Sequence, residues 1–242
     1  MLNQASSQRA TASPVESVAR THVGRVRKLN EDRALDRPDM SLWAVADGMG
    51  GHAAGDVAAT VVIEELAALD PAVETIAACL ERANDRLLDH AAETGQDAIA
   101  TTIVVLGLTE THAYCVWSGD SRAYLFRRGR LAQITRDHSL VQDLVEAGRI
   151  SAEDARVHPQ SHIVTQAVGI DDVVELETTE VAREPGDVFL LCSDGLTGML
   201  NDDEIAGVLR VNDLPSAADA LLQAALDRGG HDNVTLVLVR AP

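Results

Sequence analysis

Two apolar segments that each end in Asp-Gly constrain this chain more than any other feature. Residues 42–46 precede Asp47 and Gly48, and residues 188–192 run through Ser193 into Asp194 and Gly195. Short apolar runs of this length are typical of buried strands, and a glycine-rich turn after a strand lets backbone approach a ligand. One such segment could be an ordinary strand-to-helix turn. Two of them favour a shared site of carboxylates.

Composition limits the class of protein. The chain has 242 residues, of which 46% are hydrophobic and only 2% aromatic, so Ala, Val, Leu and Ile must build the core. No apolar run approaches the roughly 20 residues needed to cross a bilayer. Residues 1–17 are polar and lack the apolar segment of a signal peptide. We therefore expect a flexible tail over 1–17, one domain over 18–242, and a cytoplasmic protein without a membrane partner.

Charge and residue usage exclude several chemistries. A net charge of −18 argues against nucleic-acid binding, and an acidic protein that binds phosphate needs cations nearby. Lys28 is the only lysine, so no Walker-type phosphate loop exists, and there is no G-x-S-x-G motif either. Cys79, Cys115 and Cys192 have neither disulfide nor zinc spacing, so we expect buried small hydrophobic residues.

Periodicity predicts a mixed fold in which strands outnumber helices. Two sheets packed face to face, with a helix pair on each outer side, are the simplest arrangement of these elements. An antiparallel meander is expected around residues 101–134. The predicted strands cover 19–23, 42–46, 101–108, 113–118, 123–127, 131–134, 164–168, 175–181, 188–192 and 234–239. The predicted helices cover 53–69, 71–94, 139–147, a short segment after Ser151, 202–209 and 216–227.

Five acidic residues share one setting, because each is expected in a turn beside an apolar strand, and four of them have a glycine close by. Each alone is most simply a turn residue. Together at one end of a sandwich they would repel one another unless cations lay between them, which indicates a two-metal site. These residues are Asp32, Asp47, Asp120, Asp194 and Asp232.

The order of the motifs resembles the metal-dependent PPM/PP2C serine/threonine protein phosphatases, in the form of their compact bacterial branch. The matching segments occur in the family's order and span most of the chain. They are Arg27-Lys28-Leu29-Asn30-Glu31-Asp32, Ala46-Asp47-Gly48-Met49-Gly50-Gly51-His52, Thr101-Thr102, Gly119-Asp120-Ser121-Arg122, Ser193-Asp194-Gly195 and Gly230-His231-Asp232-Asn233.

The resemblance implies an α+β fold, an αββα four-layer sandwich of two antiparallel sheets flanked by helix pairs. It also implies two Mn²⁺ or Mg²⁺ ions and possibly a third. Asp47 would bridge the two ions, and the Gly48 carbonyl would bind one of them. The other implied ligands are Asp194 and Asp232 on the first ion, Glu31 and Asp32 acting mostly through metal-bound waters, and Asp120 on a third ion. Asn233 would support the neighbouring ligand.

The implied reaction is direct attack of a metal-bridging hydroxide on phosphoserine or phosphothreonine, because two divalent ions lower the pKa of a shared water. Arg27 would grip the phosphate, since a guanidinium fork matches two phosphate oxygens. His52 is a candidate proton donor to the leaving group, although Met49-Gly50-Gly51 separates it from Asp-Gly, unlike the histidine of many eukaryotic members.

Residues 138–162 match the family's flap, a segment over the site. Leu196-Thr197-Gly198 lacks the acid that eukaryotic members often carry there, so water or Ser161 would complete the third ion's shell. His138, His158 and His162 have irregular spacing and predict no separate metal site.

The sequence therefore predicts a metal-dependent serine/threonine protein phosphatase, a phosphoric monoester hydrolase. Its expected partners are phosphorylated proteins and a cognate bacterial Ser/Thr kinase, and it is expected to be a monomer in a signalling pathway. One alternative is a catalytically silent binding or regulatory module that kept the fold. Another is a phosphatase whose substrate is a small phosphorylated regulator.

Overall fold

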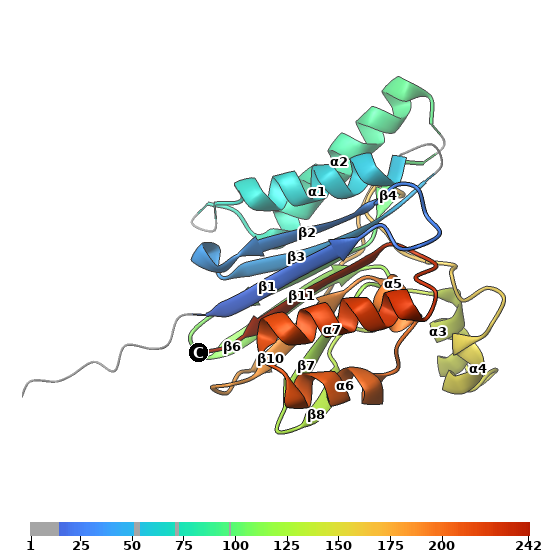
Figure 1. Cartoon of the computed structure of the whole chain (residues 1–242). Coiled ribbons are helices and arrows are strands. Elements are labelled where there is room, and N and C mark those ends of the chain that lie inside the picture. Colours follow the sequence, from blue (N-terminus) through green and yellow to red (C-terminus); the bar gives the residue numbers. More distant parts are fainter. Residues whose placement is uncertain (1–14, 51–53, 71–72, 97) are drawn as a thin grey trace, which may run out of the picture.

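The computed structural model describes residues 15–50, 54–70, 73–96 and 98–242. Figure 1 shows four layers, with helices α1 (Ala54–Ala68) and α2 (Ile76–Thr94) outside one sheet and α6 (Asp202–Val211) and α7 (Leu214–Asp227) outside the other. The predicted αββα sandwich is therefore confirmed. Two short helices, α3 (Leu140–Glu146) and α4 (Ala152–Arg156), stand to one side of the layers.

Both sheets are antiparallel. The five-stranded sheet has the order β1 (Glu16–His22), β11 (Val234–Arg240), β10 (Val188–Cys192), β7 (Arg122–Arg127) and β8 (Arg130–Gln133). The other sheet has the order β2 (Asp32–Arg37), β3 (Leu42–Met49), β5 (Ile103–Leu108), β6 (His112–Ser118) and β9 (Glu177–Ala182), and the short β4 (Ala100–Thr101) pairs with the end of β3.

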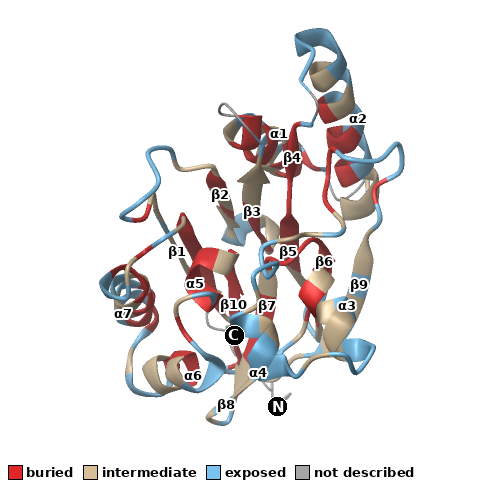
Figure 2. Cartoon of the chain, turned by 90° about the vertical axis from the view of Figure 1, so that its right-hand side faces the viewer, coloured by how far each residue is buried: buried red, intermediate tan, exposed pale blue. Residues whose placement is uncertain are grey.

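Three apolar clusters hold the layers together. One lies between the sheets and contains Trp43, Leu106 and Phe189, all almost completely buried. The other two lie between each sheet and its helices, around Leu66 on one side and Leu221 on the other. Figure 2 shows the buried residues concentrated in the strands and in the sheet-facing sides of the helices. Aliphatic residues supply most of these clusters, as the composition predicts.

Capping residues set several helix ends. Thr75 accepts a hydrogen bond from the backbone of Ala78 and begins α2, so the expectation that this helix begins near Pro71 is wrong; Pro71 itself lies outside the described residues. Gly95 ends α2 in the left-handed conformation with φ 66°, in agreement with the helix end expected at residue 94. Ser151 precedes α4, as predicted, and the structure adds a reciprocal capping box between Ser151 and Asp154.

Three expectations about the strands are wrong. Strand β2 was missed, because only Leu35 in its polar edge-strand sequence is a buried hydrophobic residue. The meander expected over 101–134 is divided, since β5 and β6 belong to one sheet and β7 and β8 to the other. Residues 164–168 form only isolated bridges, through Val164 and Val168.

Strand β1 begins at Glu16, inside the range expected to be a tail. In the described part of the chain, no helix is long and apolar enough to span a membrane. All three cysteines are free and buried, as predicted. The short elements not yet named are a 3₁₀ turn, η1 (Pro38–Met40), and α5 (Asp194–Thr197).

Candidate metal centre

Asp47 lies inside a strand rather than in a turn after it. Strand β3 continues to Met49, and Asp47 stands opposite Asp32 of β2 in antiparallel register. Thr102 holds the Asp47 backbone on the other side, because its hydroxyl accepts the Asp47 N–H at 3.2 Å and its own N–H donates to the Asp47 carbonyl at 2.9 Å. The expectation of a strand ending at residue 46 is therefore wrong, and strand pairing brings two of the five acids together.

Gly48 is the point where strand β3 meets the beginning of α1. A Cβ at Gly48 would lie 2.0 Å from the carbonyl oxygen of Gly55, so no larger residue fits without moving backbone. The backbone N–H of Gly55 donates to the Glu31 carboxylate, a favourable placement for an anion at a helix N-terminus. The pKa of Glu31 is raised, since its burial outweighs the attraction of Arg27.

Asp194 and Asp232 lie just beyond the ends of two neighbouring strands of the five-stranded sheet. Asp194 follows β10 as the first residue of α5, and Asp232 precedes β11. A Cβ at Gly195 would lie 1.8 Å from the carbonyl oxygen of Asn233, so α5 packs directly on the backbone beside Asp232. Residues far apart in the sequence are thus held close together by glycine packing.

Arg27 lies beside this acidic group, on the loop between β1 and β2. Its guanidinium donates to the Asp232 carboxylate at 2.7 Å, and about half of its side chain is exposed. Glu31, on the same loop, also attracts Arg27. The residue predicted to grip phosphate is therefore exposed and adjacent to the predicted metal ligands.

The acids interact strongly with one another. Burial raises the pKa of Asp47 well above its ordinary value, and the charges of Asp32, Asp194, Asp120 and Asp232 raise it further. Burial also raises the pKa of Asp32 to about 7 and that of Asp120 to about 8. The pKa of Asp194 is raised by burial and by Asp232, and a hydrogen bond with Asp47 opposes that rise. All five predicted acids therefore form one electrostatic cluster.

The cluster has the donor chemistry of a site for hard divalent cations. Asp32 is 1% exposed; one carboxylate oxygen accepts a hydrogen bond from Ser193 at 2.8 Å, whereas the other, Oδ1, is buried without a partner. Carboxylate oxygens are preferred ligands of Mg²⁺ and Mn²⁺, and cations would relieve the repulsion that raises the pKa values. The residues present therefore fit such ions.

Within the ranges that the structure describes, the acidic side chains do not form a complete set of ligands for a metal ion. Among the described residues, no three His, Cys, Asp or Glu side chains are positioned to hold one ion. Asp232 is instead paired with Arg27. Joint coordination by Asp47, Asp194 and Asp232 therefore requires rearrangement of side chains, including release of this ion pair.

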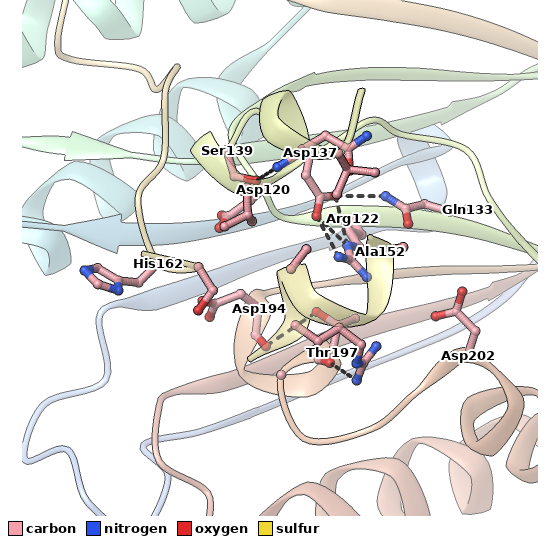
Figure 3. A pocket seen from close by; sticks show the side chains of 17 residues that line it. Asp120, Arg122, Gln133, Asp137, Ser139, Ala152, His162, Asp194, Thr197 and Asp202 are labelled. Carbon is pink, nitrogen blue, oxygen red and sulfur yellow. Dashed lines mark hydrogen bonds and ion pairs between the residues drawn. The ribbon is translucent and has the colours of Figure 1, made fainter. Parts of the chain in front are cut away.

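A pocket of about 360 Å³ adjoins the cluster. Asp120 and Asp194 line it together with residues of α3, α4 and the following segment, including Ser161 and His162. Figure 3 shows Asp120 and Asp194 near one another on this pocket, with His162 nearby. The flap predicted over 138–162 thus borders the site, and its Ser161 lines the same pocket as the residue predicted to bind a third ion.

Sequence reasoning missed the residues that brace the Asp120 turn. Arg122 binds Asp137 through both Nε and Nη2, at distances down to 2.6 Å (Figure 3). Ser121 shares a 2.7 Å hydrogen bond with Thr102, the residue that also holds Asp47. The motifs Thr101-Thr102 and Gly119–Arg122 were the available signal, but side-chain partners cannot be read from motif spacing.

The histidines have separate roles. His138 is buried, accepts the Gly119 N–H at Nδ1, and places Nε2 3.3 Å from Glu177, outside hydrogen-bonding geometry. Through the contact with Gly119 it supports the backbone of the turn that carries Asp120. His52, the candidate proton donor, lies outside the described residues.

Comparison with known proteins gives a consistent result. The family model described as protein phosphatase 2C matches residues 17–234. A serine/threonine phosphatase stp of Listeria welshimeri is 37% identical over 237 residues, covering 91% of this chain and 93% of the relative. The solved structure of PppA, described as a key regulatory component of T6SS in Pseudomonas aeruginosa, is 39% identical with a TM-score of 0.88, covering 96% and 99% of the two chains.

A further solved structure bears on the cofactor. The catalytic domain of the serine/threonine protein phosphatase PstP, in complex with two manganese ions, is 36% identical with a TM-score of 0.84 and covers 93% of this chain and 97% of its own. This agrees with the two divalent ions predicted from the resemblance. No observation favours the silent binding module. The chain belongs to the protein phosphatase 2C family and is a serine/threonine protein phosphatase.

Proposed function

We propose that this chain hydrolyses phosphoserine and phosphothreonine in proteins by direct attack of water at phosphorus, with two Mn²⁺ or Mg²⁺ ions as cofactors. When bound, such ions would lower the pKa of water and so supply a nucleophile near neutral pH. The observation that carries the proposal is the convergence of five acids from separate segments of the chain, since Asp32 pairs with Asp47 across two strands and the charges of Asp120, Asp194 and Asp232 also act on Asp47.

Each predicted metal ligand among the described residues has a proposed role. Asp47 and the Gly48 carbonyl would hold ions at the end of β3, with Asp194 and Asp232 opposite them. Glu31 and Asp32 would act on the ions through water. Asp120 would hold a third ion beside the pocket that it lines together with residues of the flap.

Arg27 is assigned to the phosphate group and His52 to the leaving group. Arg27 exchanges its contact with Asp232 for phosphate oxygens, which a half-exposed guanidinium can do without being withdrawn from a buried network. This exchange also frees Asp232 to turn toward a cation. His52 is the proposed proton donor to the leaving serine or threonine oxygen.

The experiment is hydrolysis of p-nitrophenyl phosphate and of a phosphothreonine peptide, with MnCl₂ and with EDTA. We expect turnover only with metal. In Arg27→Ala we expect weaker metal-dependent turnover, mainly because KM rises. Absence of turnover by the wild-type protein at every Mn²⁺ concentration would contradict the proposal and favour the silent module.

The cellular setting is a proposal separate from the chemistry. We propose that residues 18–242 act as one phosphatase domain, with the flap at about 138–162, as a monomer in the cytoplasm that reverses phosphorylation by a Ser/Thr kinase in a signalling pathway. The family match over 17–234 supports a phosphatase domain, and the relatives named as serine/threonine phosphatases support phosphorylated proteins as substrates. Phosphoproteomics after deletion of the gene tests it, since phosphoserine and phosphothreonine sites of a shared kinase should accumulate.

A further inference from the structure

The loop that carries Arg27 has little packing of its own. It connects β1 to β2 over residues 23–31, and residues 25–29 are exposed. Even its apolar members face solvent, with Val26 61% and Leu29 41% exposed. Since neither a core nor regular secondary structure orders this segment, hydrogen bonds to neighbouring segments hold its backbone, while the Arg27 guanidinium itself contacts Asp232.

One side chain, that of Asn233, contacts both ends of the loop. Asn233 is 5% exposed, and its Nδ2 donates to the carbonyl oxygens of Val23 and Leu29, both at 2.9 Å. Its Oδ1 accepts the backbone N–H of Glu31 at 2.7 Å. The opposite amide orientation would place an oxygen against two carbonyl oxygens and an NH₂ group against an N–H. The amide therefore joins both ends of the loop.

The loop is also seated on the backbone that precedes Asn233. A Cβ at Gly24 would lie 2.2 Å from the carbonyl oxygen of Asp232. The N–H of Arg25 donates to the carbonyl of Gly230 at 2.8 Å. The segment that supplies Asp232 to the acidic cluster thus also forms the seat of the Arg27 loop.

We propose that Asn233 is a positioning residue for phosphate binding, acting through Arg27. Its amide closes the base of the loop and so sets the guanidinium at a defined place beside the acidic cluster. The predicted support of Asp232 comes from the backbone N–H of Asn233, which donates to Asp232 Oδ1 at 2.8 Å; the side chain serves the loop. This inference rests on the proposed role of Arg27 in binding phosphate.

Proteolysis tests the clamp without any need for activity. Lys28 is the only lysine of the chain, so endoproteinase Lys-C can cut the protein only within this loop. Cleavage by a protease tracks the population of the opened state. In Asn233→Ala, loss of two donors and one acceptor should speed cleavage by about tenfold or more, while the circular dichroism spectrum stays that of the wild type.

Variants of different severity keep this test decisive. Asn233→Asp retains the shape but sets an oxygen against two carbonyl oxygens, so cleavage should again be faster. Asn233→Ser keeps a hydroxyl donor and should be intermediate, and it serves if the alanine variant does not fold. Asn212→Ala is the matched control, because Asn212 donates only to Val208 within α6; its cleavage should match the wild type. Wild-type cleavage rates in the folded Asn233 variants would overturn the proposal.

Kinetics tests whether the clamp acts through Arg27. With a phosphothreonine peptide at saturating Mn²⁺, Asn233→Ala should raise KM by about tenfold and leave the Mn²⁺ concentration for half-maximal activity unchanged. The double variant with Arg27→Ala should behave like Arg27→Ala alone. If the two substitutions raise KM by factors that multiply in the double variant, Asn233 does not act through Arg27. A changed Mn²⁺ concentration for half-maximal activity would refute action through Arg27 as well.

The two assays separate the possible failures. A wild-type protein without Mn²⁺-dependent turnover would contradict the proposed function, and the cleavage rates would still decide whether Asn233 closes the loop. An active wild type with unaltered cleavage in the Asn233 variants would refute only this inference.

Discussion

Replacement of Asp32 by asparagine should stabilise the metal-free protein at alkaline pH, although it removes a buried hydrogen-bonding carboxylate. Asp32 is 1% exposed, with one oxygen bonded to Ser193 and the other without a partner. Burial raises the pKa of Asp32 from 3.8 to about 7, and the charges of Asp194 and Asp232 add to the effect. Ionised Asp32 is therefore a destabilising charge when no cation neutralises it.

The expected size follows from linkage. The unfolded chain releases the Asp32 proton near its ordinary pKa, whereas the folded chain retains it up to about pH 7. Stability that the protonated carboxyl contributes is thus lost as pH rises from about 4 to 7. The rise in pKa corresponds to about 4 kcal/mol. Asparagine avoids that cost but leaves a buried NH₂ donor, which costs about 1–3 kcal/mol.

The net gain is therefore about 2 kcal/mol at pH 8. For a chain of this length, that raises Tm by about 4–8 °C. The measurement is thermal unfolding in EDTA at several pH values between 5 and 8, with Asp172→Asn, an exposed loop residue, as the control. The gain should shrink steadily toward pH 5, where the wild-type carboxyl is protonated in the folded state. A change in Tm independent of pH, or destabilisation at pH 8, would refute the reasoning.

Three further predictions concern the ligands, the glycine packing and the thiols. Asp47→Asn should abolish both activity and the Mn²⁺-induced rise in Tm while the circular dichroism spectrum persists; normal turnover would show that Asp47 bridges no ions. Gly195→Ala should lower the free energy of unfolding by about 3 kcal/mol in urea titrations, because the added Cβ would meet the backbone of Asn233. The control is Gly207→Ala in α6, which should be neutral or slightly stabilising, because no atom lies near its Cβ. Iodoacetamide at pH 8 should label none of the cysteines before unfolding, since burial raises the thiol pKa of Cys79 to about 11 and those of the other two to about 12; rapid labelling of the native protein would contradict this.

The fold was predictable where local patterns carry the information. The continuous apolar run before Ser193 predicts β10, and the serine at 151 with an acid three residues later predicts the start of α4. Strand β2 was not predicted because Leu35 is its one buried hydrophobic residue, and four of its six residues are charged. The division of the 101–134 region between two sheets also escaped, since the turn from β6 to β7 has the composition of any tight turn.

The site was predictable in its membership and less so in its geometry. The five acids form one cluster, as the ordered motifs imply, yet Asp47 stands in a strand and Asp194 begins a helix. The contacts that hold them, such as Thr102 on Asp47 and Asn233 on the Arg27 loop, join residues 55 and about 200 positions apart. Spacing along the chain contains no measure of such distances.

The amino-acid sequence alone determined which donors are available and in what order: hard oxygen ligands beside glycines, an arginine for phosphate, and apolar runs for a layered core. Only the tertiary structure decided how these groups meet. Strand pairing and glycine contacts bring distant carboxylates into one partly buried cluster, where their charges raise one another's pKa values. That happens because repulsion depends on separation and burial in the folded molecule, and both arise only when the two sheets pack together.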